Sequence, residues 1–261
     1  MYSISKDGTK IAYEKKGSAS GPVLILVLGA LNKRGSGKKL TQHLADQFTV
    51  ISYDRRGRGD STDVLPYKTE HEVEDLAALI DDLGGSAYLY GHSSGAVLAL
   101  LAAKELGKKV KGLALYELPY DDDPEAQKVA KEYRKALKQL LAEDRRGEAV
   151  ELFIKPFGVT DKQIAAMQRM PLWKGLTGMA HTLVYDTVEL MEQYPKIDSG
   201  SIDTQTIVMY GAASPAFMGD TAKKLSRTLP HATLQSLEGQ THDVKAEVLA
   251  PYLIEFFKAV R

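Results

Sequence analysis

The segment Ala87-Tyr88-Leu89-Tyr90-Gly91-His92-Ser93-Ser94-Gly95 sets a serine between two glycines, directly after a short apolar run. Residues 96–106, which follow it, have the apolar composition of a helix packed against a sheet. The order strand, G-x-S-x-G, helix predicts a sharp turn that strains the backbone at Ser93. The flanking glycines would let neighbouring backbone pass without a Cβ clash. We therefore expect Ser93 to be presented above the edge of a sheet, at a helix N-terminus that favours negative charge.

Strand and helix patterns alternate on both sides of this segment. Continuous apolar runs are typical of strands buried on both faces, and Asp7-Gly8 is a hairpin turn signal. We predict strands at residues 3–5, 10–14, 23–28, 48–53, 87–90, 110–116, 206–210 and 233–237. The alternation predicts an α/β fold, in which helices flank a mostly parallel, eight-stranded sheet on both faces. One of these helices is expected over residues 69–83, opened by a capping box of Thr69 and Glu72.

The pattern changes between the strands at 110–116 and 206–210, where helical periodicity dominates. Helices are predicted at residues 124–143, 147–154, 161–170 and 172–193, the last with breaks. We expect a core domain made of residues 1–118 and 201–261, with residues 119–200 inserted as a helical cap, or lid. The cap would lie over the carboxyl ends of the strands, where open α/β sheets bind ligands.

The composition excludes several classes of protein. Lys and Arg together number 34, and so do Asp and Glu. The chain therefore lacks the basic excess that would indicate nucleic acid or an anionic membrane as a partner. Without cysteine there is no disulfide, no Cys-ligated zinc and no thiol nucleophile. No cofactor-binding motif occurs, so we expect no cofactor, and no metal. With no signal-peptide pattern at the start, we expect a cytoplasmic protein, either a monomer or a homodimer.

A serine hydroxyl needs a base and an orienting acid before it can act as a nucleophile. His242 follows Glu238-Gly239-Gln240-Thr241 in a loop after the last strand, and we predict that it is the base. The loop after the strand at 206–210 has Ser214 where an aspartate would be expected. Glu117, at the end of the strand at 110–116, is therefore the predicted acid, with Asp220 as the alternative.

Other positions follow from these three. The oxyanion hole is expected from the backbone N–H groups of Ser94 and of Ala30, which follows the strand at 23–28. We interpret the segment 54–61, Asp-Arg-Arg-Gly-Arg-Gly-Asp-Ser, as a tight loop held by arginine–carboxylate pairs, not as a phosphate-binding loop. Candidate substrate-pocket residues are Leu31, His92, Trp173, His181 and Tyr185; for the apolar and aromatic residues of the insert, a place in the cap core is the alternative.

These residues resemble the α/β-hydrolase family along essentially the whole chain. The resemblance rests on the nucleophile elbow 91–95, the loop 53–61 and the run 238–242. It is greatest for bacterial hydrolases with Tyr-Glu-x-Pro after the sixth strand and Ser-Pro after the seventh. Zearalenone-type lactonases and haloalkane dehalogenases are similar in having a glutamate at the position of Glu117. Two features depart from the family pattern: Leu28-Gly29 replaces His-Gly before the oxyanion loop, and the seventh-strand acid is absent.

The resemblance implies a cofactor-independent serine esterase or lactonase that cleaves a small, largely apolar carboxylic ester or lactone through an acyl-enzyme. A serine nucleophile argues against the alkyl-enzyme chemistry of dehalogenases and epoxide hydrolases. Two alternatives stay open. One is a ligand-binding protein with the hydrolase fold and little turnover, and the other is a lyase or C–C hydrolase that uses the same triad.

Overall fold

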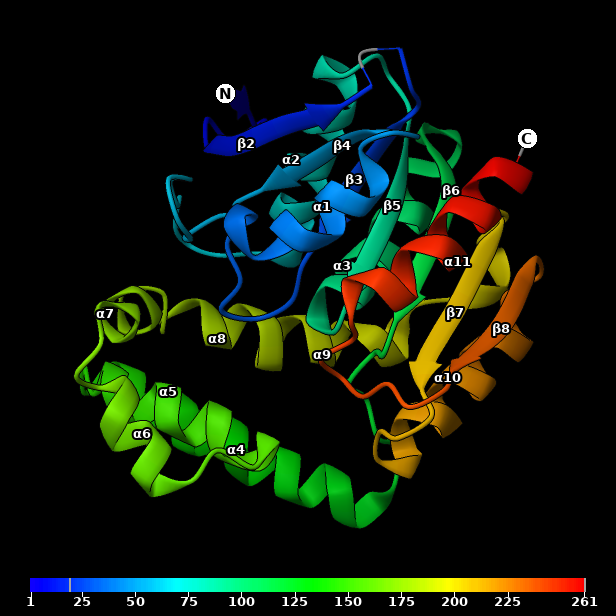
Figure 1. Ribbon diagram of the computed structural model, residues 1–261. Helices are drawn as coiled ribbons and strands as arrows, with labels where there is room; N and C mark the ends of the chain where they lie inside the picture. The colour runs from blue at the N-terminus through cyan, green and yellow to red at the C-terminus, as the bar shows by residue number, and fades with distance from the viewer. Residues whose placement is uncertain (19, 261) are drawn as a thin grey trace.

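An eight-stranded sheet forms the centre of the molecule in the computed structural model, which describes residues 1–18 and 20–260 (Figure 1). The strand order is β1-β2-β4-β3-β5-β6-β7-β8. The strands are β1 Tyr2–Ile4, β2 Lys10–Gly17, β3 Val23–Val27, β4 Thr49–Tyr53, β5 Ala87–His92, β6 Val110–Tyr116, β7 Thr206–Gly211 and β8 Ala232–Leu237. β2 runs antiparallel to β1 and β4. The other six strands, β3 to β8, are parallel to one another. The predicted α/β fold class and sheet are confirmed.

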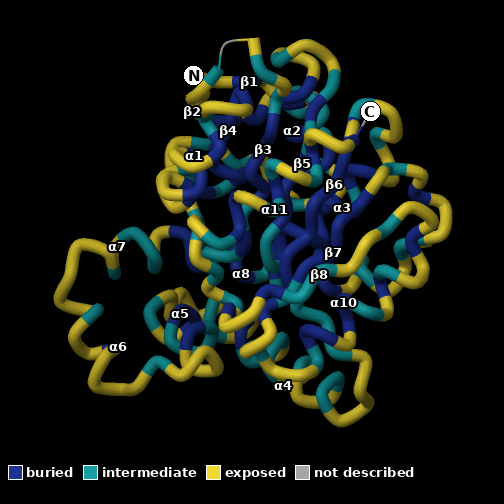
Figure 2. Tube along the Cα trace, turned by 45° about the vertical axis from the view of Figure 1, so that its right-hand side comes forward, coloured by how far each residue is buried: buried dark blue, intermediate teal, exposed yellow. Residues whose placement is uncertain are grey.

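Helices cover both faces of the sheet, as the continuous apolar strands require. On one face lie α1 (Lys38–Leu44) and α11 (Ala246–Ala259), and on the other lie α2 (Thr69–Asp82), α3 (Ser94–Leu106) and α10 (Ala216–Thr228). Figure 2 shows the buried residues concentrated along the central strands. Short 3-10 turns connect several elements, at Arg34–Gly37, Gly107–Lys109, Lys155–Phe157, Tyr194–Lys196 and Ser199–Ser201.

The segment between β6 and β7 is helical in the structure. It contains α4 Pro124–Ala142, α5 Arg146–Ile154, α6 Asp161–Met167, α7 Pro171–Gly178, α8 Thr182–Val184, a π-helical turn η4 Tyr185–Glu189, and α9 Leu190–Gln193. In Figure 1 it lies at the end of the sheet to which the β7 arrow points. α4 to α6 lie farthest from the sheet in that view, whereas α9 packs against α3. We call residues 119–200 the insert, and their status as a separate cap stays a prediction.

Close backbone packing explains the two glycines around Ser93. A Cβ on Gly95 would lie 2.1 Å from the carbonyl oxygen of Val27 in β3, and one on Gly91 would lie 2.6 Å from Cα of Ala96. Such distances are far shorter than van der Waals contact, so only glycine fits at either position. α3 can therefore leave β5 close against the sheet, with Ser93 at φ 58° between them.

The helix predicted from Thr69 begins where expected, but the capping box predicted for it is wrong. α2 begins at Thr69, one residue after its N-cap Lys68, and no capping box forms because the Glu72 carboxylate is buried against Arg55 instead. α10 begins at Ala216, with Pro215 as its N-cap, so Asp220 lies inside this helix and does not cap it.

No helix in the described ranges 1–18 and 20–260 is both long and apolar enough to span a bilayer.

We predict that Gly95→Ala lowers the free energy of unfolding by about 3 kcal/mol or more, because the new methyl group would overlap the Val27 carbonyl. Gly178→Ala is the matched control, since nothing lies within 4 Å of the added carbon, and it should change stability by less than about 1 kcal/mol. Urea unfolding of the three proteins measures both effects. Equal stability of the two variants would contradict the close approach of α3 and β3.

Candidate active site

Backbone strain is concentrated where the central strands end. Four non-glycine residues in the described part of the chain have positive φ, and three of them lie just beyond the carboxyl ends of β3, β5 and β6. They are Leu31 at 56°, Ser93 at 58° and Glu117 at 49°. The three strands are neighbours in the sheet, so the strained residues share one edge. Strain of this kind costs about 1–3 kcal/mol per residue and clusters at functional sites.

Ser93 is held in its strained conformation by the neighbouring strand. Its N–H donates to the carbonyl of Tyr116 at 3.0 Å, and its own carbonyl accepts from the N–H of Ala96 at 2.8 Å. It is the N-cap of α3, so its side chain stands at the positive end of a buried helix. The bond to Tyr116, the last residue of β6, also places Ser93 close to Glu117, which follows Tyr116 in the chain.

Glu117 and His242 are joined by a short hydrogen bond. Oε2 of the fully buried Glu117 lies 2.7 Å from Nδ1 of His242, and Oε1 accepts from the N–H of Gly211 at 2.8 Å. Burial raises the pKa of Glu117, but the His242 ring, the nearby Ser214 hydroxyl and the Gly211 N–H outweigh it and lower the pKa. The carboxylate is therefore ionised and accepts the proton of Nδ1. A neutral His242 then keeps a lone pair on Nε2, the form that a general base needs.

Two further hydrogen bonds hold the loop that carries His242. The Tyr116 hydroxyl donates to the carbonyl of Thr241 at 2.6 Å, and Nε2 of His92 lies 2.9 Å from the carbonyl of His242. Because a carbonyl can only accept, Nε2 of His92 has the proton. Burial, and after it the electrostatic influence of the His242 ring, lowers the pKa of His92 to about 4, so His92 stays neutral and holds the loop.

Asp220, the alternative acid, is not brought to this cluster. It is 70% exposed, and its carboxylate lies 3.1 Å from the ammonium group of Lys223 one turn further along α10. α10 begins at Ala216, so Asp220 lies in the second turn of this helix, where its side chain is exposed.

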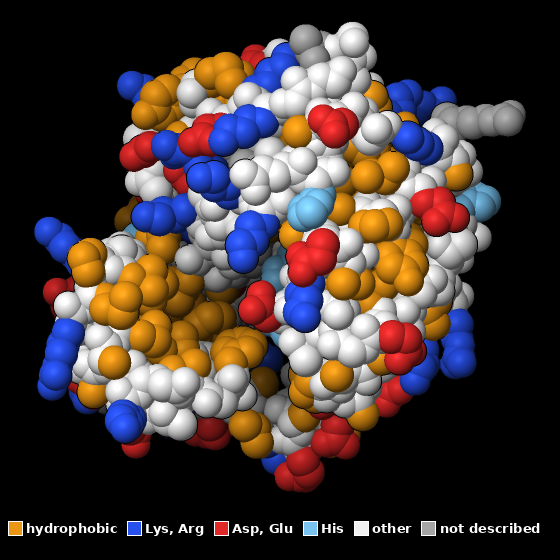
Figure 3. All heavy atoms as spheres, viewed as in Figure 1, with side chains coloured by type: hydrophobic (Ala, Val, Ile, Leu, Met, Phe, Trp, Pro, Cys, Tyr) orange, Lys and Arg blue, Asp and Glu red, His pale blue; other side chains and the backbone are white. Residues whose placement is uncertain are grey.

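A cavity of about 470 Å³ opens beside Ser93. Ala30 and Ser94, the predicted oxyanion residues, line it together with Ser93. The rest of its wall comes mostly from the insert and is largely apolar: Pro119, Ala126, Val129, Ala130, Tyr133, Phe153, Pro156, Phe157 and Met191, with Phe217 from α10. Figure 3 shows apolar side chains around a hollow at the lower left, in the region where Figure 1 draws the insert.

The five predicted pocket residues do not line this cavity. Tyr185 stacks on Tyr67 at 3.8 Å between ring centroids and donates to Asp63 at 2.7 Å. Nε2 of His181 lies 3.6 Å from the same carboxylate. The Tyr185 hydroxyl and Nε2 of His181 thus both face Asp63, in the segment between β4 and α2.

The other three predicted pocket residues also have other partners. Trp173 and Leu31 pack into the apolar core of the insert, which is the alternative raised above for Trp173. His92 is turned to the loop of His242. The actual wall includes Ala126, Val129, Ala130 and Tyr133, whose i, i+3, i+4, i+7 spacing along α4 was a readable signal for one apolar face.

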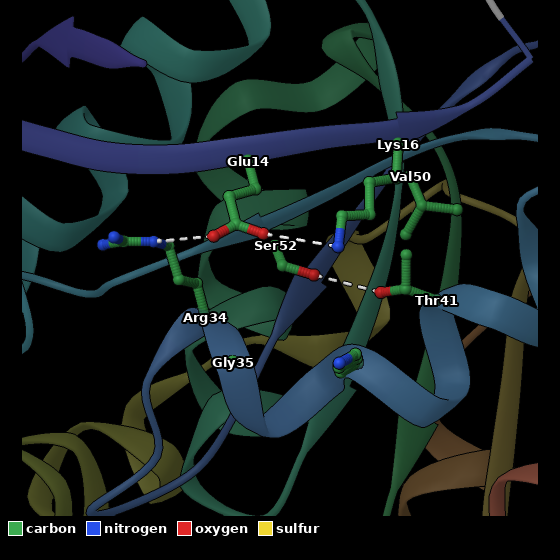
Figure 4. A pocket seen from close by; sticks show the side chains of 8 residues that line it. Glu14, Lys16, Arg34, Gly35, Thr41, Val50 and Ser52 are labelled. Atoms are coloured by element: carbon green, nitrogen blue, oxygen red, sulfur yellow. Dashed lines mark hydrogen bonds and ion pairs between the residues drawn. The ribbon is translucent and has the colours of Figure 1, made fainter.

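A second cavity, of about 230 Å³, lies between β2, β4 and α1 and has a different character (Figure 4). Glu14 in its wall is paired with Arg34 at 3.4 Å and with Lys16 at 3.7 Å, and Thr41 bonds Ser52 at 3.2 Å. Glu14, Lys16 and Arg34 in its wall are thus paired with one another. Nowhere in the described ranges do three or more His, Asp or Glu side chains cluster as metal ligands would.

The low pKa of His92 predicts an acid-sensitive fold. Unfolded His92 takes up a proton near pH 6.5 and folded His92 only near pH 4, so its contribution to stability is complete above pH 6.5 and is lost as the pH falls towards 4. Between pH 7 and pH 4.5 the wild type should lose about 2 kcal/mol more stability than His92→Gln, which keeps an N–H donor but does not titrate. Urea unfolding at the two pH values measures this, and equal losses would refute it.

Comparison with known proteins identifies the family and agrees with the fold. The model of the alpha/beta hydrolase family matches residues 34–251. An alpha/beta hydrolase of known structure from Sphaerobacter thermophilus DSM 20745 is 46% identical with a TM-score of 0.86, and the match covers 98% of this chain and 100% of the other. An esterase from Thermogutta terrifontis shares the fold at 23% identity, with a TM-score of 0.77 and coverage of 100% and 98%.

Curated relatives match over shorter stretches. The uncharacterised hydrolase YraK of Bacillus subtilis is 35% identical over 97 residues, which cover 36% of this chain and 35% of YraK. The bifunctional esterase/perhydrolase DCH of Acinetobacter calcoaceticus is 31% identical over 131 residues, which cover 49% of this chain and 42% of DCH. The chain therefore spans less than half the length of these two relatives. The family model and the full-length structural match nevertheless agree, and this chain belongs to the alpha/beta hydrolase family.

Proposed function

We propose that this hydrolase cleaves a carboxylic ester or lactone of a small, largely apolar substrate through an acyl-enzyme on Ser93. The observation that carries the proposal is the 2.7 Å hydrogen bond between buried Glu117 and His242, directly beside the strained turn of Ser93. A buried acid, a histidine and a serine at a nucleophile elbow are the three parts of a serine-hydrolase triad.

The proposed reaction has two halves. Ser93 Oγ attacks the substrate carbonyl while Nε2 of His242 takes its proton, and Glu117 stabilises the resulting imidazolium. The N–H groups of Ala30 and Ser94 donate to the oxyanion of the tetrahedral intermediate. As the intermediate collapses, the alcohol leaves with the proton from His242 and Ser93 stays acylated. Water, deprotonated by His242, then attacks the acyl group and releases the acid and the free serine.

The character of the cavity supports the proposed substrate class. Its volume of about 470 Å³ suits a small molecule, and apolar side chains make up most of its wall. We propose that the insert, residues 119–200, acts as the cap, because α4 and the turn at Lys155–Phe157 supply much of this wall. The relative DCH of Acinetobacter is an esterase/perhydrolase, which supports an ester bond as the target.

We predict that the wild type hydrolyses p-nitrophenyl acetate and is labelled by a fluorophosphonate probe, whereas Ser93→Ala does neither. Loss of the nucleophile should reduce kcat by about 10⁴-fold or more. Assays of short esters, lactones and cyanohydrins on both proteins would separate ester hydrolysis from lactone or lyase chemistry. A wild type that neither turns over nor labels would refute the proposal.

A second prediction concerns the acid. Glu117→Gln should lower kcat by about 10²–10⁴-fold, because the amide no longer fixes the tautomer of His242 or stabilises its charge. Asp220→Asn is the matched control and should leave kcat within about threefold, since Asp220 is exposed on α10. Steady-state kinetics with the same ester decides between them. The opposite ranking of the two variants would exclude Glu117 as the acid.

A further inference from the structure

A buried carboxylate of the insert reaches the turn after the proposed nucleophile. Asp186, in the π-helical turn η4, is fully buried and accepts three hydrogen bonds of 2.7 Å. Its Oδ1 accepts from the Ser94 hydroxyl and from Nη1 of Arg55, and its Oδ2 accepts from Nη2 of Arg58. Ser94 is the residue whose backbone N–H is one of the two proposed oxyanion donors.

The two arginines extend this cluster to the other proposed donor. Nη1 of Arg55 donates to the carbonyl of Leu28 at 3.3 Å, and Nη1 of Arg58 donates to the carbonyl of Gly29 at 3.4 Å. The carbonyl of Gly29 and the N–H of Ala30 belong to one trans peptide group, in which the two point in opposite directions. The same carbonyl also accepts from the N–H of Asn32 at 3.3 Å and from its Nδ2 at 3.4 Å. Because Arg58 holds the carbonyl on its own side, together with Asn32, the N–H of Ala30 points away from Arg58.

Electrostatic balance makes the cluster rigid. Glu72 pairs with Arg55 at 2.6 Å, so two arginines and two carboxylates neutralise one another with almost no exposure to solvent. Burial raises the pKa of Asp186, but Arg58, Arg55 and Ser94 outweigh this effect and lower the pKa, so the carboxylate is charged at neutral pH. A buried charge pair with good hydrogen-bond geometry fixes positions more strictly than an exposed one.

We propose that Asp186 is a positioning residue that orients both peptide groups of the oxyanion hole, one through Ser94 and the other through Arg58. The inference rests on the proposed function, since it assumes that Ala30 and Ser94 donate to an oxyanion. It gives the insert a second role beside shaping the pocket. The competing explanation is that Asp186 only anchors the insert to the core domain through its ion pairs.

The double variant Arg58→Met/Asp186→Asn separates the two explanations, because it removes one positive and one negative charge and leaves the buried cluster neutral. Replacing a buried pair in this way often leaves stability nearly unchanged. The matched control is Arg56→Met/Asp75→Asn. Arg56, from the same loop, and Asp75, from α2, form a buried pair joined at 2.7 Å. The other hydrogen bonds of Arg56 go to Asp7 and to the carbonyl of His71, not to Ser94 or Gly29.

Both double variants and the wild type are assayed for kcat and KM on a p-nitrophenyl ester, and for inhibition by an alkyl boronic acid, which forms a tetrahedral adduct with a serine. We expect Arg58→Met/Asp186→Asn to lower kcat by about 10–100-fold, somewhat less than the loss of a whole oxyanion donor. KM should stay within about threefold, and boronate affinity should fall in parallel with kcat/KM. The control should keep all three values within about threefold.

An unchanged kcat and boronate affinity in Arg58→Met/Asp186→Asn would overturn the inference, as would a rise in KM alone. If this variant does not fold, Ser94→Ala decides, because it removes only the hydroxyl bond to Asp186. A several-fold fall in its kcat at constant KM supports positioning, and an unchanged kcat overturns it. Ser93→Ala, run alongside, identifies a different failure: without Ser93-dependent turnover in the wild type, the proposed function itself is wrong, and the inference falls with it.

Discussion

The hydrogen bond between Glu117 and His242 ties together three loops that are far apart in the sequence. Glu117 follows β6, Gly211 ends β7, and His242 follows β8, and one carboxylate bonds to both of the others. Because Glu117 is fully buried, its charge is sustained by hydrogen-bonding partners such as these and not by water. The geometry of the candidate active site therefore depends on Glu117, whose carboxylate connects the end of β6 to the end of β7 and to the loop after β8.

Close packing and strain set the other side of the site. Gly95 lets α3 approach β3, and this approach forces Ser93 into the positive-φ turn that exposes its side chain to the cavity. The buried arginines of the loop after β4 join that turn to the loop after β3 and to the insert. The loops after β3 and β4 and the insert thus meet in a charged cluster directly behind the proposed oxyanion hole.

The extent to which the site could be predicted differs from part to part. The elbow was readable because G-x-S-x-G depends on local backbone crowding, and the missing acid after β7 directed attention to Glu117, whose bond to His242 the structure contains. The arginine–carboxylate pairing of the 54–61 loop was foreseen, but its main partners, Glu72 and Asp186, come from α2 and from the insert. The pocket residues were misassigned because aromatic character alone does not say which face of an insert helix meets the cavity. The apolar spacing along α4 did contain that information.

The most direct test of this account is the proton NMR spectrum of the wild type, labelled with ¹⁵N-histidine. The signal to be found is that of the Nδ1 proton of His242, in the downfield region of the spectrum. A short bond to a carboxylate should give a resonance well downfield of other ring protons. The account predicts that Glu117→Gln abolishes this resonance and Asp220→Asn leaves it in place. Its persistence in Glu117→Gln, or its loss in Asp220→Asn, would contradict the central role of Glu117.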